Sequence, residues 1–209
     1  MANDLSSRRA ILVGIAALGT GLVAQPQVGS AITQAQAQGL IANVVSDLSG
    51  IVNSGRSAGG MIADFDGILQ RYADIDVMAR SALGAPARSA SASDIAAFAA
   101  VFRGYLARKY GGLLFGDYNG GNVEVMGTRA VQSFFVVESR AAMRRQSNRA
   151  QEVLRVDWHV SDRSGRDLFF NMVIEGINLL TNERQEIGTM LDQRRGDIAR
   201  LTRDLGARG

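Results

Sequence analysis

QEVLRVDWHVSDRSGRDLFFNMVIE, residues 151–175, is the stretch that decides the fold. Apolar and polar residues alternate in its two halves, which is typical of β-strands with one buried face. The apolar positions are Leu154, Val156, Trp158 and Val160 in the first half and Leu168, Phe170, Met172 and Ile174 in the second. Asp162-Arg163-Ser164-Gly165 between them has the composition of a turn. The stretch therefore predicts an antiparallel hairpin with strands over 151–161 and 166–175.

The period of two continues upstream of this hairpin and gives way to a helical period on both sides of it. Two further strands are predicted over 122–129 and 131–139. Apolar repeats of three and four residues predict helices over 40–52, 62–72, 74–83, about 91–110 and 197–205, and another that begins near 182. Helices followed by an antiparallel meander and closing helices predict an α+β fold, with a four-stranded antiparallel sheet packed on helices.

Residues 1–37 have the layout of an export signal. Ser7-Arg8-Arg9 precedes a Gly- and Ala-rich apolar run, Ala10 to Val23, which is shorter than the roughly 20 residues that a bilayer crossing needs. Ala35-Gln36-Ala37 then matches a small-residue cleavage signal. The adjacent arginines favour the twin-arginine route over general secretion, and an uncleaved anchor is the alternative. The prediction is a periplasmic protein cleaved near Ala37, with one mature domain over 38–209.

The composition excludes several classes of function. A formal net charge of +3 is too small to indicate a nucleic-acid-binding protein, and the absence of cysteine excludes disulfides and thiolate metal sites. The pairs Asp64/Asp66 and Asp74/Asp76 resemble metal ligands, but no calcium-type loop with a closing glutamate follows either pair. Helix capping explains Asp74 better, with Gly84 as the end of the helix it begins. We therefore expect no metal and no cofactor.

Glu175 stands in one of the most apolar parts of the chain and raises the question of catalysis. A general acid would need a histidine, a second carboxylate or a metal close by, and no sequence neighbour of Glu175 supplies one. The only histidine, His159, alternates with polar residues and is expected to be exposed. There is no nucleophile elbow and no phosphate loop. The sequence therefore predicts a protein that is not an enzyme. In it, the Glu175 carboxylate accepts hydrogen bonds from turn amides or pairs with an arginine such as Arg184.

Three segments carry a resemblance to a known family. They are YADIDVMARSALG at 72–84, FAAVFRGYLARKYG at 98–111 and VIEGINLLTNERQEI at 173–187. Taken in this order behind an export signal, they resemble the MlaC family of periplasmic phospholipid-binding proteins, also called the toluene-tolerance auxiliary family. The chain departs from the family at Asn182-Glu183-Arg184, where many members have Asn-Tyr-Arg.

The resemblance implies a monomeric phospholipid carrier with a deep apolar cavity. Such a carrier would move phospholipid between an outer-membrane lipoprotein/porin complex and an inner-membrane ABC transporter complex. Two acyl tails of about 30 methylenes would cost over roughly 20 kcal/mol in water, so the cavity must enclose them. The expected lipid-binding residues are Phe98, Phe102 and Leu106 on a helix and Val125, Phe135, Val156, Trp158, Phe170, Met172 and Ile174 on the sheet.

Three alternatives remain open at this point. The same residues could pack as a solid core, and the chain could then be an adaptor of a membrane complex that binds no lipid. It could also be a small enzyme that acts on a hydrophobic substrate in a similar cavity. The segment RAAMRRQSNR, residues 140–149, is expected to be a loop between the second and third strands. Its arginines, Arg140, Arg144, Arg145 and Arg149, would either contact anionic lipid heads or an acidic partner, or simply be solvated.

Overall fold

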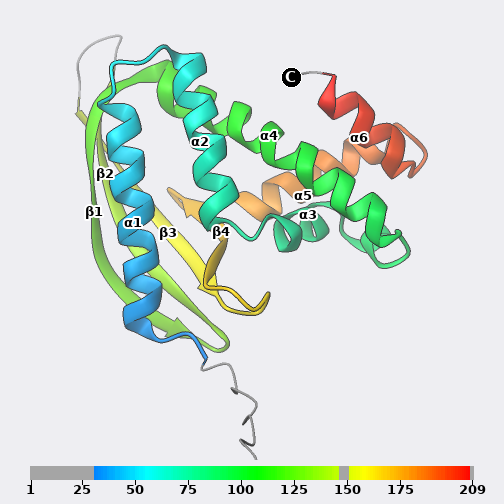
Figure 1. The fold of residues 1–209 in the computed structure, drawn as a ribbon, viewed down its shortest axis with the longest axis horizontal. Coiled ribbons are helices and arrows are strands. Elements are labelled where there is room, and N and C mark those ends of the chain that lie inside the picture. Colours follow the sequence, from blue (N-terminus) through cyan, green and yellow to red (C-terminus); the bar gives the residue numbers. More distant parts are fainter. Residues whose placement is uncertain (1–30, 146–150, 208–209) are drawn as a thin grey trace, which may run out of the picture. The chain divides into compact units, whose positions relative to one another are not determined.

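The structure is a computed structural model that describes residues 31–145 and 151–207 (Figure 1). The helices are α1 (Gln34–Val52), α2 (Ala58–Tyr72), α3 (Ile75–Leu83), the short 3-10 helix η1 (Ala85–Arg88), α4 (Ala92–Asp117), α5 (Leu179–Asp192) and α6 (Ile198–Gly206). The strands are β1 (Tyr118–Val131), β2 (Phe134–Arg145), β3 (Gln151–Ser161), β4 (Leu168–Ile174) and β5 (Ile177–Asn178). The predicted α+β class and the order of elements are confirmed.

The strands form one antiparallel sheet in the order β1-β2-β3-β4-β5. The prediction of four strands was wrong by one, because the chain turns back after β4 and adds the two-residue strand β5. The prediction of a loop from 140 was also wrong, because β2 continues to Arg145. Ala141 and Met143 are buried while Arg140 and Arg144 are exposed, so these residues keep the alternation of a strand with one solvated face. Arg149 lies outside the described residues.

A β-bulge in β4 changes which phenylalanine enters the core. The register pairs Trp158 with Met172 and His159 with Asn171, then shifts by one residue and pairs Val160 with Phe169. Phe169 is 1% exposed and packs edge-on against Trp158, with ring centroids 5.2 Å apart. Phe170 lies on the opposite face against His159, at 5.8 Å between centroids. Simple alternation placed Phe170 with Met172, but one extra residue in a strand exchanges the two faces.

The helices pack on one another and on β1. Figure 1 shows α1 running alongside the long strands β1 and β2, and α4 leading away toward α3, α5 and α6. Helix α4 continues past Gly111-Gly112, where the sequence predicted its end. A Cβ on Gly111 would lie 3.2 Å from Ile62 of α2 and 3.4 Å from Phe65. Gly111 therefore allows close packing of two helices and does not end one.

Capping residues set the ends of several helices. Asp74 accepts a hydrogen bond from the Val77 amide at 3.2 Å, and Gly84 ends the same helix α3 with a φ of 66°. Both roles were predicted, and both are confirmed. Helix α5 begins at Leu179, earlier than the predicted 182, because the Asn178 side chain accepts a hydrogen bond from the Thr181 amide.

The start of α1 includes the predicted cleavage signal. Thr33 and Gln36 form a capping box, and the Ile32 amide donates to the Asp162 carboxylate at 2.9 Å. Ala35 and Ala37 therefore lie in the first turn of α1, and the Ala37 side chain is fully buried. Residues 1–30, which hold the rest of the predicted export signal, lie outside the described residues. In the part of the chain that is described, no helix has the length and apolar character to cross a bilayer.

Candidate functional site

An apolar cavity of about 420 Å³ lies between the inner face of the sheet and the helices. Its sheet wall is formed by Val123, Ser139, Ala141, Met143, Leu154, Val156, Trp158, Met172 and Ile174. Its helix wall is formed by Leu48 and Val52 of α1, Phe65 of α2, Tyr110 and Leu113 to Phe115 of α4, and Leu179 of α5. Glu175 and Ile177 complete the lining at the turn between β4 and β5. The lining is therefore almost entirely hydrocarbon, as expected of a site for an apolar ligand.

Four of the ten residues predicted to bind lipid line this cavity: Val156, Trp158, Met172 and Ile174. Val125 and Phe135 are partly buried and pack against the core beside it. The helix positions do not line the cavity. Phe98, Phe102 and Leu106 are at most 1% exposed and belong to the solid core. Phe170 is outside because the bulge places it on the other face of the sheet.

Sequence reasoning missed the part of α4 that closes the cavity. Tyr110 and the apolar run Leu113-Leu114-Phe115 line it, and they stand at and beyond the glycines at which the helix was expected to end. The usable signal was the run Leu113-Leu114-Phe115 itself, because three large apolar residues in a row are unusual in a solvated loop. The α1 residues Leu48 and Val52 belong to an apolar face that the sequence did reveal.

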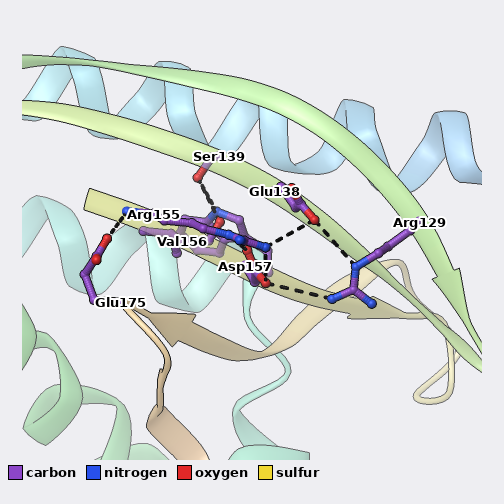
Figure 2. A network of polar contacts seen from close by, with 8 residues as sticks. Arg129, Glu138, Ser139, Arg155, Val156, Asp157 and Glu175 are labelled. Atoms are coloured by element: carbon purple, nitrogen blue, oxygen red, sulfur yellow. Dashed lines mark hydrogen bonds and ion pairs between the residues drawn. The ribbon is translucent and has the colours of Figure 1, made fainter. Parts of the chain in front are cut away.

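The buried hydroxyl of Ser139 in the sheet wall is already satisfied. Trp158 Nε1–H donates to Ser139 Oγ at 2.9 Å. Ser139 Oγ–H in turn donates to the Val156 carbonyl at 3.3 Å (Figure 2). Ser139 is 0% exposed. The pair holds the indole ring in a definite position while presenting its carbon atoms to the cavity.

Glu175 shapes the turn at the edge of the cavity. Glu175 and Gly176 have φ angles of 49° and 81°, which is the left-handed geometry of a two-residue hairpin loop. The Glu175 carboxylate accepts a hydrogen bond from the Arg155 amide, and the Glu175 amide donates to the Arg155 carbonyl at 3.0 Å (Figure 2). Among the described residues no group of metal-ligating side chains includes Glu175. The carboxylate was expected to accept hydrogen bonds from turn amides or to pair with Arg184, but the amide that it accepts belongs to Arg155 of the neighbouring strand β3.

The outer face of the sheet carries a network of ion pairs (Figure 2). Arg155 contacts Glu138 at 3.3 Å and Asp157 at 3.0 Å, and Arg129 reaches Glu138 at 3.5 Å. The hydrogen bond to Asp157 raises the pKa of Arg155 above its ordinary value. Both arginines are more than half exposed, so the network adds little to stability and instead keeps this face of the sheet hydrophilic.

A partly buried polar cluster joins α4 to α5. Lys109 Nζ lies 2.7 Å from Glu183 and 2.5 Å from Glu186, while the hydroxyls of Tyr110 and Tyr105 donate to the same two carboxylates at 2.6 Å and 2.7 Å. Burial by itself would lower the pKa of Lys109, but hydrogen bonds to both carboxylates outweigh it and the pKa is raised. Burial and the bond to Glu183 raise the pKa of Tyr110. Lys109 is therefore held as an ammonium and Tyr110 as a neutral phenol at neutral pH.

Glu183 belongs to the segment Asn182-Glu183-Arg184, and its side chain is 0% exposed. It would be an uncompensated buried charge without Lys109 and Tyr110. Because Tyr110 also lines the cavity, the cluster anchors the helix wall of the site.

The structure is an α+β domain with an apolar cavity between its sheet and its helices. The sequence profile described as "MlaC protein" matches residues 32–207, and the chain belongs to this family. A similar solved structure is the phospholipid-binding protein from Ralstonia solanacearum in complex with a phospholipid. It has 19% sequence identity and a TM-score of 0.64, over 82% of this chain and 96% of that one. The comparison with curated proteins gave no match.

Proposed function

We propose that this protein is a periplasmic phospholipid carrier of the Mla type. In this role it encloses acyl tails in the cavity and carries phospholipid between an inner-membrane ABC transporter complex and an outer-membrane lipoprotein/porin complex. The observation that carries the proposal is the hydrocarbon-lined cavity in a chain of the MlaC family. Export, processing near Ala37 and a monomeric state are parts of the same proposal. Family and fold point to a binding or transport protein and not to an enzyme.

The cavity has a suitable size for one acyl chain. A dry cavity of about 150 Å³ accepts benzene, which has six carbons, so about 420 Å³ accepts roughly 17 carbons by the same ratio. A lipid with two tails therefore requires the sheet and helix walls to move apart, or the second tail to lie along the opening. The walls come from separate elements, the sheet on one side and α1 and α4 on the other. Such walls can separate without breaking the hydrogen bonds within either one.

The energetics of transfer constrain how such a carrier works. Each methylene gains about 0.8 kcal/mol on leaving water, whether it enters a bilayer or this cavity. The exchange between membrane and protein is therefore close to neutral, and the carrier by itself sets no direction. Direction must come from the complexes at either membrane.

Native mass spectrometry of protein purified without detergent tests the proposal, with Ala141→Phe and Ala142→Phe as matched variants. Ala141 lines the cavity, whereas its neighbour Ala142 is not among the lining residues and alternates to the other face of β2. We expect about one phospholipid per chain in the native protein and in Ala142→Phe, and much less in Ala141→Phe.

The single tryptophan, Trp158, gives a second readout because it lines the cavity. Its fluorescence should change when lipid is removed. A native protein without lipid that takes none up from vesicles would contradict the carrier and favour an adaptor. Equal lipid content in the two variants would show that the lipid binds elsewhere. The intact mass of the periplasmic form tests the cleavage site.

A further inference from the structure

The cavity opens toward the start of β3. Val156 lines it and is 9% exposed, whereas Leu154, the next lining residue toward the start of the strand, is half-buried. Ile177 of β5 lies close to these residues, since it pairs with Ile174, which pairs with Val156. Ile177 and Leu113 of α4 both line the cavity and are 67% and 58% exposed. A side chain that lines a cavity and is more than half exposed lies where the cavity opens, so the mouth is at this end of the sheet.

An ion pair lies at this mouth, on the same face of the sheet as the cavity lining. Glu152 of β3 lies directly opposite the lining residue Met143 of β2, and Arg145 comes two residues after Met143. Cross-strand partners and residues two apart share one face of a sheet. Arg145 Nε and Nη2 lie 2.8 Å and 2.7 Å from Glu152 Oε1. The two side chains are 38% and 36% exposed, so a cation and an anion stand side by side where the cavity meets water.

Arg145 differs in its position from the other described arginines of the segment 140–149. Arg140 and Arg144 alternate with the lining residues Ala141 and Met143, and so they lie on the outer face of the sheet. Arg145 is therefore the described cation of this segment that a ligand in the cavity can reach.

We propose that the Arg145–Glu152 pair binds the headgroup of a zwitterionic phospholipid with a primary ammonium, such as phosphatidylethanolamine. This inference rests on the proposed carrier function. Arg145 binds the phosphate, because its planar guanidinium matches the oxygens of a phosphate group in charge and geometry. Glu152 binds the ammonium, whose N–H groups donate charge-assisted hydrogen bonds to a carboxylate. The pair therefore selects such lipids over phosphatidylglycerol, whose headgroup offers hydroxyls and no cation to the carboxylate.

The position of the pair suits a headgroup better than a purely structural role. The cavity lining is almost entirely hydrocarbon, so a lipid whose tails lie inside it leaves its headgroup at the mouth. An ion pair whose side chains are both more than one third exposed adds little to stability by itself. A zwitterion aligned antiparallel to the pair gives each of the four charges two opposite neighbours, whereas an anionic headgroup leaves Glu152 facing added negative charge.

Uptake from vesicles that contain equal amounts of phosphatidylethanolamine and phosphatidylglycerol tests the proposal. The lipid-free protein is incubated with the vesicles and separated from them, and native mass spectrometry then gives the amount of each lipid per chain. We expect the native protein to take up about threefold more phosphatidylethanolamine, which is the size of effect that a partly exposed ion pair supports. In Glu152→Gln this ratio should fall to about one. Glu138→Gln is the matched control, because Glu138 is 34% exposed and ion-paired on the outer face, and its ratio should equal that of the native protein.

A second pair of variants tests the cation. Arg145→Gln should reduce the uptake of both lipids about threefold or more, because both contain the phosphate. Arg144→Gln, at the neighbouring position on the outer face, should leave the uptake unchanged. Equal uptake by these two variants would overturn the role of Arg145.

The ratio of the two lipids and their total amount separate this proposal from the carrier function. A native protein that takes up lipid with no preference, or a Glu152→Gln variant that keeps the native preference, would overturn the headgroup site and leave the carrier function standing. If Glu152→Gln fails to fold, the comparison of Arg145→Gln with Arg144→Gln decides. A native protein that takes up neither lipid would reject the carrier function itself.

Discussion

The partly buried cluster between α4 and α5 leads to a quantitative prediction about Lys109. Its ammonium is the only cation of the described residues that contacts Glu183, whose carboxylate is completely buried and has one oxygen, Oε2, without a hydrogen-bond partner there. Lys109→Met keeps the length of the side chain and removes the charge. It leaves Glu183 to be stabilised by Tyr110 alone.

The expected loss is about 3 kcal/mol of unfolding free energy, at the lower end of the range for breaking a buried pair, because Lys109 is itself 23% exposed. The double variant Lys109→Met/Glu183→Leu should recover about 2 kcal/mol of this loss, since no fully buried unpaired charge then remains. Glu186, the other partner of Lys109, is 39% exposed and keeps its hydrogen bond from Tyr105. Arg71→Met is the matched control. It removes an ion pair with Asp47 whose partners are 64% and 36% exposed, and it should cost clearly less stability than Lys109→Met.

Urea unfolding of the lipid-free proteins measures these differences, because bound lipid would add its own stabilisation. A loss in Lys109→Met no larger than that in Arg71→Met would refute the reasoning. So would a double variant that is less stable than Lys109→Met. Either result would mean that burial of Glu183 does not depend on its contact with Lys109.

Three further predictions concern the bulge, the start of α1 and the histidine. Phe169→Ala should lower the free energy of unfolding by about 3 kcal/mol or more, and Phe170→Ala by clearly less, because only Phe169 is fully buried. Equal losses of stability in urea unfolding would contradict the bulged register. A chain that begins at Gln38 should be less stable than one that begins at Ile32 by at least about 1 kcal/mol, since it lacks the capping box of α1. Equal melting temperatures of the two chains would show that the first turn of α1 is dispensable for stability. Burial lowers the pKa of His159 below 6.5, so the stability present above pH 6.5 should fall as the pH drops toward the folded-state pKa. His159→Gln should reduce this loss of stability at low pH. A pH profile of stability that is unchanged in the variant would exclude His159 as the cause of the loss.

The local pattern of apolar and polar residues was sufficient to predict the helices and strands and their order along the chain. Alternation in 151–175 identified the hairpin, and helical repeats identified the helices before and after the sheet. Asp74 and Gly84 marked the two ends of α3 because capping depends on a few neighbouring residues. Glu175-Gly176 was correctly interpreted as a turn for the same reason.

The position and lining of the cavity depend on tertiary contacts, which local sequence patterns do not predict. The bulge decided that Phe169, and not Phe170, packs with Trp158, and a single extra residue leaves no signal in a period of two. The predicted helix residues Phe98, Phe102 and Leu106 are as apolar as a cavity wall, but their surroundings fill the space around them. The end of α4 became the wall instead, because Gly111 let α4 pass close to α2 and continue.

The sequence by itself determined the α+β class, the antiparallel meander, the helix caps and the resemblance to MlaC proteins, because each is written in short-range periodicity or in contiguous residues. Only the tertiary structure decided where the cavity lies, which residues open it to solvent, and that Glu183 is a buried carboxylate held by Lys109, 74 residues away in the chain. The physical reason is that burial and charge pairing are properties of neighbours in space. They follow from how the helices and the sheet pack, which periodicity along the chain does not specify.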